Sequence, residues 1–220
     1  MTKVGVVLSG CGVYDGSEIH ESVLTLLALD RAGAQVQCMA PDVDQMHVIN
    51  HLTGDVTAET RNVLVEAARI ARGAVIDIAQ VSADDIDALA IPGGSGAAKN
   101  LCDFAVAGAE AKPNPEVARL VKEMLAAQKP IAALCIAPAL MASIFREAGI
   151  EGEVTIGTDS DTASAIVAMG TLHVDCPVDE FRVDEKNRVI TTPVYMLAGG
   201  IAEAARGIDT TIAELLRLAG

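Results

Sequence analysis

Short apolar segments rich in β-branched residues alternate with longer segments of helical periodicity along most of this sequence. A strand followed by a helix and then by another strand is typical of a parallel sheet, because a parallel connection has to cross a face of the sheet. Strands that are buried on both faces are almost continuously apolar, as these are. The pattern therefore predicts an α/β fold with a mostly parallel central sheet.

The boundaries of the elements follow from apolar periodicity, glycines and prolines. The predicted strands are 4–9, 35–40, 75–79, 88–91 and 131–134, and a later pair, 180–183 and 189–191, flanks a polar turn and indicates a hairpin. The predicted helices are 16–32, 57–72, 115–127 and 201–218. No linker-like segment divides the 220 residues, so we expect residues 1–220 to form a single domain.

Composition limits the partners and the compartment. The formal net charge of −14 argues against a nucleic acid or an anionic membrane as partner, because both require a basic surface. The longest apolar run, 130–142, is interrupted by Cys135 and Pro138 and is shorter than the roughly 20 residues of a membrane span. Residues 1–3 lead directly into the first strand without the pattern of a signal peptide, and the five cysteines are scattered, so we expect a cytoplasmic protein with reduced thiols.

The segment 131–141, IAALCIAPALM, places a cysteine where an apolar strand meets a helix. A nucleophile at such a sharp turn needs small residues two positions before and after it, and Ala133 and Ala137 meet that need. The N-terminus of a helix also lowers the pKa of a nearby thiol. The motif indicates that Cys135 is a thiolate nucleophile, although a buried, inert cysteine fits it equally well.

Two further segments follow predicted strands. The run PGGSG at 92–96 has paired glycines, whose N–H groups can turn toward a ligand as an oxyanion hole or simply form a turn. The run GSEIHE at 16–21 places Glu18 and Glu21 at the start of the first helix. Because the carboxyl ends of parallel strands gather at one edge, these acids can reach Cys135 as general acid and base, or they only complement the helix dipole.

Other patterns are weaker. Gly10, Gly12 and Gly16 resemble a dinucleotide-binding loop, but their spacing differs from GxGxxG and Asp42 lies late for a ribose-binding acid, so a nucleotide-dependent oxidoreductase is a minor alternative. The histidines show no metal-ligand spacing, and we predict neither a metal nor a cofactor. Those beside the motifs, His20 and His51, are candidates for the edge of the pocket.

Three segments together resemble the PfpI and Parkinson-disease deglycase branch of the class I glutamine-amidotransferase-like superfamily. They are the acidic segment that ends at Glu21, the loop PGGSGAAKNL at 92–101 and the elbow LCIAP at 134–138. Within this branch, the runs LSGCGVYDGSEIHE at 8–21 and VINHLTG at 48–54 are similar to the bacterial ElbB glyoxalase group, which has been linked to isoprenoid biosynthesis. The resemblance extends over essentially the whole chain.

This resemblance implies a flavodoxin-like three-layer sandwich, often dimeric, with Cys135 on a nucleophile elbow and a glutamate hydrogen-bonded to it. It places that glutamate on Glu21, with Glu18 as the reserve, and the backbone oxyanion donors on Gly94 and Ile136. Members often carry a histidine directly after the cysteine, where Ile136 stands here, or on a later strand end, where the sequence is GTD at 157–159. A histidine-containing triad is therefore not expected, and a protease is disfavoured.

Two hypotheses of function follow. The first is a glutathione-independent glyoxalase, a cofactor-independent lyase that converts glyoxal or methylglyoxal to glycolate or lactate through a hemithioacetal on Cys135, with Glu21 moving the proton. The second is a non-catalytic redox-sensing or regulatory binding protein that uses the same pocket and in which Cys135 becomes oxidised. For the glyoxalase we expect a small 2-oxoaldehyde as partner and a homodimer.

Overall fold

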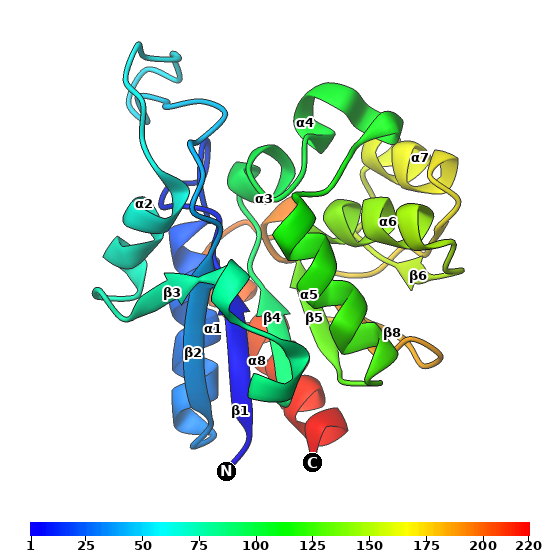
Figure 1. The fold of residues 1–220 in the computed structure, drawn as a ribbon. Coiled ribbons are helices and arrows are strands. Elements are labelled where there is room, and N and C mark those ends of the chain that lie inside the picture. The colour runs from blue at the N-terminus through cyan, green and yellow to red at the C-terminus, as the bar shows by residue number, and fades with distance from the viewer.

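The computed structural model describes residues 1–220 and contains one seven-stranded sheet in the order β3-β2-β1-β4-β5-β9-β8 (Figure 1). All neighbouring strands are parallel except β8 and β9, which form the predicted hairpin. The strands are β1 Lys3–Val7, β2 Gln35–Ala40, β3 Val75–Asp77, β4 Ala88–Ile91, β5 Ile131–Leu134, β8 Arg182–Asp184 and β9 Val189–Thr192. A separate parallel pair consists of β6 Glu153–Val154 and β7 Leu172–His173.

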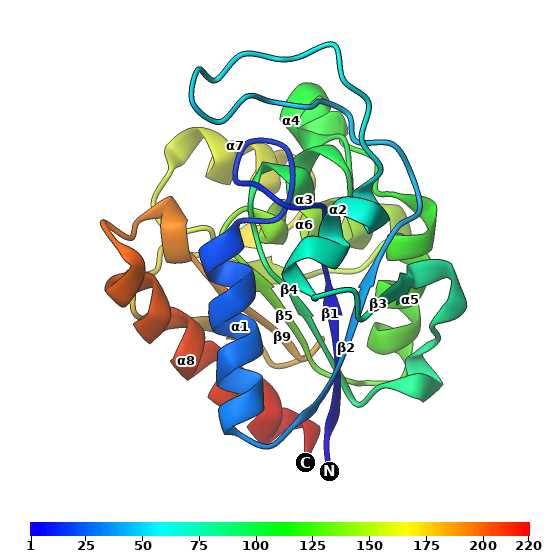
Figure 2. The same ribbon diagram turned by 90° about the vertical axis from the view of Figure 1, so that its left-hand side faces the viewer.

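Helices cover both faces of the sheet, so the predicted α/β sandwich with a mostly parallel sheet is confirmed. Figure 2 shows α1 and α8 together on one face and α5 on the other. The helices are α1 Ile19–Arg31, α2 Val63–Ile70, α3 Ser95–Lys99, α4 Phe104–Ala107, α5 Pro115–Ala126, α6 Ala137–Ala148, α7 Ser160–Ala168 and α8 Ile201–Ala219. Short 3-10 turns are η1 Ile78–Gln80, η2 Ala83–Asp85, η3 Gly108–Glu110 and η4 Val194–Met196.

Alternation along the strands divides the core into two layers. On β4, Ala88 and Ala90 face the layer that α1, α2 and α8 cover, whereas Leu89 and Ile91 face the layer of α5 and α6. Successive side chains of a strand point to opposite faces, so a strand buried on both sides has to be apolar throughout. All four residues of β4 are fully buried, which explains why the strands lack a polar face.

Two predicted helices begin later than the sequence indicated. The first begins at Ile19 instead of residue 16, because residues 10–17 form a loop and the Glu18 side chain caps the helix. The second begins at Val63 instead of residue 57, because the Asn62 side chain accepts the Val65 N–H at 3.0 Å and fixes the start of the helix there. The preceding segment, 41–62, is an irregular excursion that projects beyond the sheet in Figures 1 and 2.

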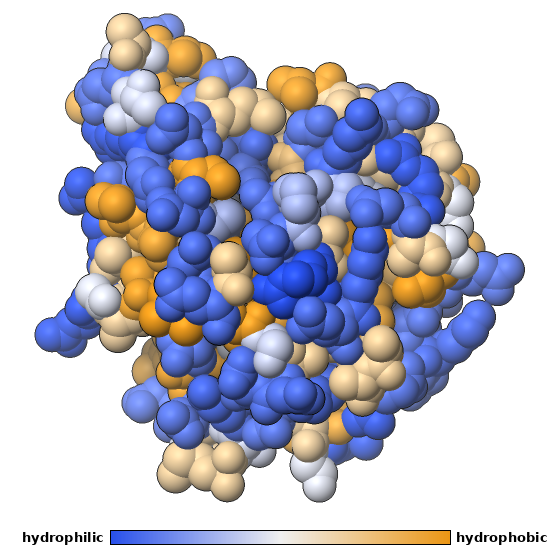
Figure 3. Space-filling model, in the orientation of Figure 1, coloured by the Kyte–Doolittle hydropathy of each residue, from blue (hydrophilic) through white to orange (hydrophobic).

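The surface over α5 is mainly polar, with apolar side chains in scattered groups (Figure 3). No helix combines the length and the hydrophobicity that crossing a lipid bilayer requires.

The topology brings three strand ends together. Strands β1, β4 and β5 are consecutive neighbours in the sheet, and β2 lies on the other side of β1. Ligands of open α/β sheets bind outside the carboxyl ends of the strands where the strand order reverses. The segments that follow β1, β4 and β5 are those that carry Glu21, Gly94 and Cys135.

Phe145 on α6 is the largest of the fully buried side chains and packs in the core layer of α5 and α6. We expect Phe145→Ala to lower the free energy of unfolding by about 3–5 kcal/mol, because it removes apolar contacts and leaves a cavity. Urea denaturation followed by circular dichroism measures this change. Leu52→Ala, at a side chain that is 97% exposed, is the matched control and should change stability by less than about 0.5 kcal/mol. A loss below about 1 kcal/mol for Phe145→Ala would contradict the packing described here.

Candidate active site

Cys135 lies between β5 and α6 with a backbone φ of +59°, which is uncommon for a residue other than glycine. Its N–H donates to the carbonyl of Thr192 at 2.9 Å, which continues the pairing of β5 with β9 by one residue before the chain turns. Ala133 and Ala137 are fully buried on either side of the turn, and Pro138 lies in the first turn of α6. The predicted strand-to-helix elbow is confirmed as backbone geometry.

Glu21 is fully buried in the first turn of α1. Its carboxylate accepts the N–H of Gly93 at 2.8 Å and the N–H of Tyr195 at 3.4 Å. The Glu18 side chain caps the same helix by accepting the Glu21 N–H at 2.6 Å. The two candidate acids therefore differ: Glu18 is tied to the helix end, whereas Glu21 connects three separate segments of the chain.

The elbow and the helix meet at the sulfur of Cys135. The Cys135 thiol and the Glu21 carboxyl group lie close enough for each to shift the pKa of the other, and the N–H groups of Gly94 and Ile136 lie close enough to the sulfur to lower its pKa. Gly93 lies between the two side chains, since an added Cβ there would come within 2.5 Å of the Cys135 Cβ and 2.7 Å of the Glu21 Oε2. The structure thus brings together the four groups for which the sequence predicted a joint role.

Burial controls the protonation of this pair. Burial, followed by the charge of Glu18, raises the pKa of Glu21 to about 7. Burial and then the charge of Glu21 raise the pKa of the Cys135 thiol well above its ordinary value, and the donors at Gly94 and Ile136 oppose this only in part. The expected lowering of the thiol pKa by the helix N-terminus is therefore wrong for the pair as it stands. Near neutral pH the thiol is therefore protonated, while the Glu21 carboxyl group releases its proton as the pH rises through about 7.

A cavity of about 330 Å³ opens above the sulfur. Its walls come from the loop after β1, from α3 and α4, from the elbow and from η4. The lining residues are Val13, Glu18, Gly94, Ser95, Ala98, Lys99, Phe104, Ala105, Cys135, Ile136, Tyr195 and Met196. Cys135 is 8% exposed, so a small molecule can reach the sulfur, whereas Glu21 lies behind it at 0% exposure.

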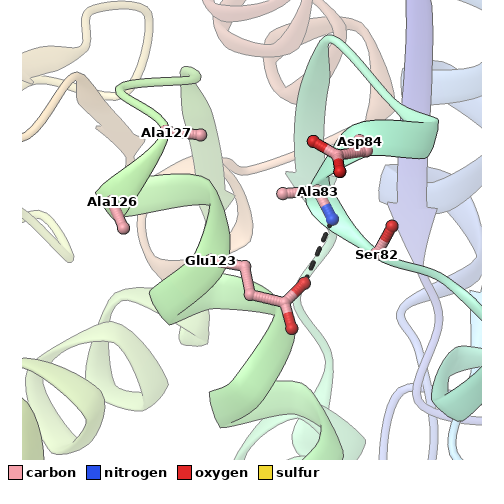
Figure 4. A pocket seen from close by; sticks show the side chains of 6 residues that line it. All are labelled: Ser82, Ala83, Asp84, Glu123, Ala126 and Ala127. Carbon is pink, nitrogen blue, oxygen red and sulfur yellow. Dashed lines mark hydrogen bonds between the residues drawn. The ribbon is translucent and has the colours of Figure 1, made fainter.

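A second hollow, of about 440 Å³, lies between η2 and α5 (Figure 4). The Glu123 carboxylate points across it and accepts the Ala83 N–H at 3.1 Å. This hollow adjoins the segment that precedes β4, at the end of the sheet opposite to Cys135, and neither a cysteine nor a histidine lines it. We therefore assign the chemistry to the cavity at the elbow.

Tyr195 is a site residue that the sequence did not identify. Its ring lines the cavity, its N–H reaches Glu21, and its hydroxyl is 2.8 Å from the Nδ1 of His20. His20 is exposed and contacts the cavity only through Tyr195. The preceding Val194 has a φ of +42°, which is rare for a β-branched residue, and such backbone strain tends to cluster at functional sites. The one feature of the sequence that could have drawn attention to Tyr195 is that the chain has only two tyrosines.

The glycine-rich loop after β1 packs against protein backbone. An added Cβ at Gly16 would lie 2.3 Å from the Cys11 nitrogen, and one at Gly96 would lie 2.5 Å from the Gly16 Cα. His51 also belongs to this loop cluster, where its Nε2 accepts the Tyr14 N–H at 3.2 Å, and it does not line the cavity. These glycines allow close approach of two loops, which accounts for the pattern that resembled a dinucleotide-binding motif.

With this geometry established, comparison with known proteins defines the class. Residues 11–148 match the model of the DJ-1/PfpI family, and the chain belongs to that family. The resemblance seen in the sequence is confirmed.

The chain is similar to particular proteins and solved structures. The chain is 48% identical to the human glutamine amidotransferase-like class 1 domain-containing protein 3, mitochondrial, over 99% of this chain and 84% of that protein. It is 47% identical to the mitochondrial ES1 protein homolog of Rattus norvegicus over the same shares. The crystal structure of an isoprenoid biosynthesis protein with an amidotransferase-like domain from Ehrlichia chaffeensis superposes over all of both chains with a TM-score of 0.93 and 38% identity. DJ-1beta of Drosophila melanogaster shares the fold, with a TM-score of 0.58 and 19% identity over 99% of this chain and 95% of that one.

The raised pKa of Glu21 makes stability depend on pH. The folded protein holds a proton on Glu21 up to about pH 7, whereas the unfolded chain releases it near pH 4.5, so this group lowers stability as the pH rises through that interval. We expect Glu21→Gln to stabilise the fold by about 1 kcal/mol at pH 5 and about 3 kcal/mol at pH 8. Urea titrations at both pH values measure the difference. The control is Glu110→Gln, at an exposed glutamate, and equal effects of Glu21→Gln at the two pH values would refute the assignment.

Proposed function

We propose that this protein is a glutathione-independent glyoxalase, which converts glyoxal or methylglyoxal to the corresponding 2-hydroxy acid. The observation that carries the proposal is the buried Cys135–Glu21 pair, in which a thiol lies beside a carboxyl group with a pKa of about 7 and the N–H groups of Gly94 and Ile136 lie near the sulfur. The relatives' names mention an amidotransferase-like domain and isoprenoid biosynthesis, and neither specifies this reaction. The proposal therefore rests on the geometry of the site.

In the first step the Cys135 thiol passes its proton to Glu21 and the sulfur attacks the aldehyde carbon. The C–S bond forms, the carbonyl π electrons move to oxygen, and the resulting alkoxide is held by the N–H groups of Gly94 and Ile136. Glu21 then returns the proton to this oxygen, which gives a neutral hemithioacetal. A carboxyl pKa of about 7 suits a group that must both accept and donate a proton near neutral pH.

In the second step Glu21 removes the hydrogen on the carbon that bears the sulfur, which gives an enediol, and delivers a proton to the neighbouring carbon. The first carbon is thereby oxidised to a thioester while the second is reduced to an alcohol. Water hydrolyses the thioester to the 2-hydroxy acid and restores the thiol. The oxidation and the reduction occur within one molecule, so the overall reaction consumes only water and needs no external oxidant or reductant.

The cavity lining supports this chemistry over a triad mechanism. It contains one cysteine and no histidine, and the histidine that lies closest along the hydrogen-bond network, His20, is separated from it by Tyr195. A protease or amidase mechanism uses such a base to protonate an amine leaving group. A 2-oxoaldehyde has no leaving group, so a single carboxyl group suffices. The homodimer, the absence of a cofactor and the cytoplasmic location stay predictions.

The first test is glyoxal and methylglyoxal consumption by purified protein without glutathione, with glycolate and lactate quantified. We expect Cys135→Ser to lose roughly a thousandfold or more in kcat/KM, because only binding and the oxyanion donors remain. Cys11→Ser, at a cysteine outside the cavity, is the matched control and should keep its activity. Wild-type protein that forms no acid, but whose Cys135 oxidises to a sulfinic acid under peroxide, would favour the redox-sensing hypothesis instead.

The second test concerns the base. Glu21→Gln keeps the shape of the side chain and an acceptor for Gly93, yet it cannot take a proton, so kcat should fall by roughly a hundredfold to ten-thousandfold. Solvent deuterium incorporated at the reduced carbon reports the proton transfer directly. Glu18→Gln leaves the proton-transferring carboxyl group of Glu21 in place, so its kcat should fall much less. Turnover by Glu21→Gln at the wild-type rate would exclude the mechanism.

A further inference from the structure

The cavity is chemically different at its two ends. At the sulfur end, Glu18 and Cys135 line it, and the Glu18 N–H donates to the Gly93 carbonyl at 3.0 Å, which places the acid beside the elbow. Lys99, the last residue of α3, lines the same cavity, and its Cα lies five residues beyond Gly94, roughly 7 Å farther along the helix. An acidic and a basic side chain therefore line the same cavity.

Lys99 is held in place but is not neutralised. Its Nζ donates to the Tyr14 carbonyl at 2.8 Å, which uses one of three N–H donors and leaves two. No carboxylate lies within 4.0 Å of this Nζ, although the chain has 30 acidic residues against 16 lysines and arginines. Partial burial lowers the pKa of Lys99 and the charge of Asp15 opposes this only in part, so the Lys99 charge is incompletely solvated where it stands. An anion that enters the cavity would stabilise the Lys99 charge in place of the missing water.

The surface between the two ends is apolar. It comes from Val13, Ala98, Phe104, Ile136 and Met196. The cavity of about 330 Å³ is far larger than glyoxal requires, since that molecule has four heavy atoms and a water molecule occupies about 30 Å³. The space fits a substrate with a short aliphatic segment between its reactive and its charged ends.

We infer that the cavity selects a 2-oxoaldehyde whose short aliphatic chain ends in a carboxylate, with the aldehyde at Cys135 and the carboxylate at Lys99. The inference rests on the proposed function and names its substrate class. Glu18 repels a carboxylate from the sulfur end while Lys99 attracts it at the other, so the charges also fix which way round the molecule binds. Lys99 is then the residue that determines specificity, and it takes no part in the chemistry at the sulfur.

Binding of unreactive analogues tests the inference separately from turnover. Levulinate has a ketone, two methylene groups and a carboxylate, and pentan-2-one is its neutral counterpart of equal chain length. In saturation-transfer NMR titrations of the whole protein, we expect levulinate to bind about tenfold more tightly than pentan-2-one, as for one charge-assisted hydrogen bond. Lys99→Met should remove this preference and Lys99→Arg should restore most of it.

The matched control is Lys112→Met, at an exposed lysine that does not line the cavity, which should keep the preference. Thermal unfolding of each variant shows whether loss of the Tyr14 contact alone disturbs the loop, and Lys99→Arg keeps both the charge and a donor. Equal affinity of the wild type for the two analogues, or a preference that persists in Lys99→Met, would overturn the inference.

Turnover provides the second arm. We expect 4,5-dioxopentanoate, the reactive analogue of levulinate, to have a kcat/KM about tenfold above that of 2-oxopentanal in the wild type and about equal to it in Lys99→Met. If neither compound is consumed while levulinate is still preferred through Lys99, the proposed function fails and the anion site stands. If both compounds are consumed at equal rates by the wild type, the proposed function stands and the substrate class is refuted.

Discussion

The site depends on how closely three segments approach one another at the peptide of Gly93. The N–H of this residue donates to the Glu21 carboxylate, its carbonyl accepts the Glu18 N–H, and its Cα lies against Cys135 with no room for a Cβ. One residue, Gly93, thus fixes the end of β4 to the start of α1 and to the elbow after β5. Any larger residue would separate the Glu21 carboxyl group from the Cys135 thiol, and the mutual influence of the two groups on their pKa values would be lost.

Burying the Cys135 thiol beside the Glu21 carboxyl group disfavours the ionisation of both groups and shifts their pKa values. Each group alone would resist ionisation because water is excluded, and each also resists the charge of the other. The pair therefore holds a proton near neutral pH that can move from sulfur to carboxylate when an electrophile approaches. The N–H groups of Gly94 and Ile136 affect the pKa of the resting thiol less than burial does, and in the proposed mechanism they stabilise the oxygen of the adduct.

Members of the family share the fold at sequence identities too low for function to be carried over from one member to another. DJ-1beta of Drosophila melanogaster superposes at 19% identity, and at that distance the likeness shows the architecture alone. One scaffold can host several chemistries, so the activity must be argued from the site. In this protein a cysteine and a buried carboxyl group adjoin a cavity that no histidine lines and that both an acidic and a basic side chain line.

The sequence by itself determined the architecture and the elbow, because both depend on patterns of residues that lie close together in the chain. Apolar runs of strand length specify a buried parallel sheet, and the small residues around Cys135 specify a sharp turn. The joint placement of Glu21, Gly94 and Ile136 came from resemblance rather than from spacing. Tyr195, the protonation of the pair and the position of Lys99 were decided only by tertiary structure. A contact between residues 174 positions apart, such as that of Glu21 with Tyr195, leaves no local periodicity, and a pKa depends on burial that only the folded chain creates.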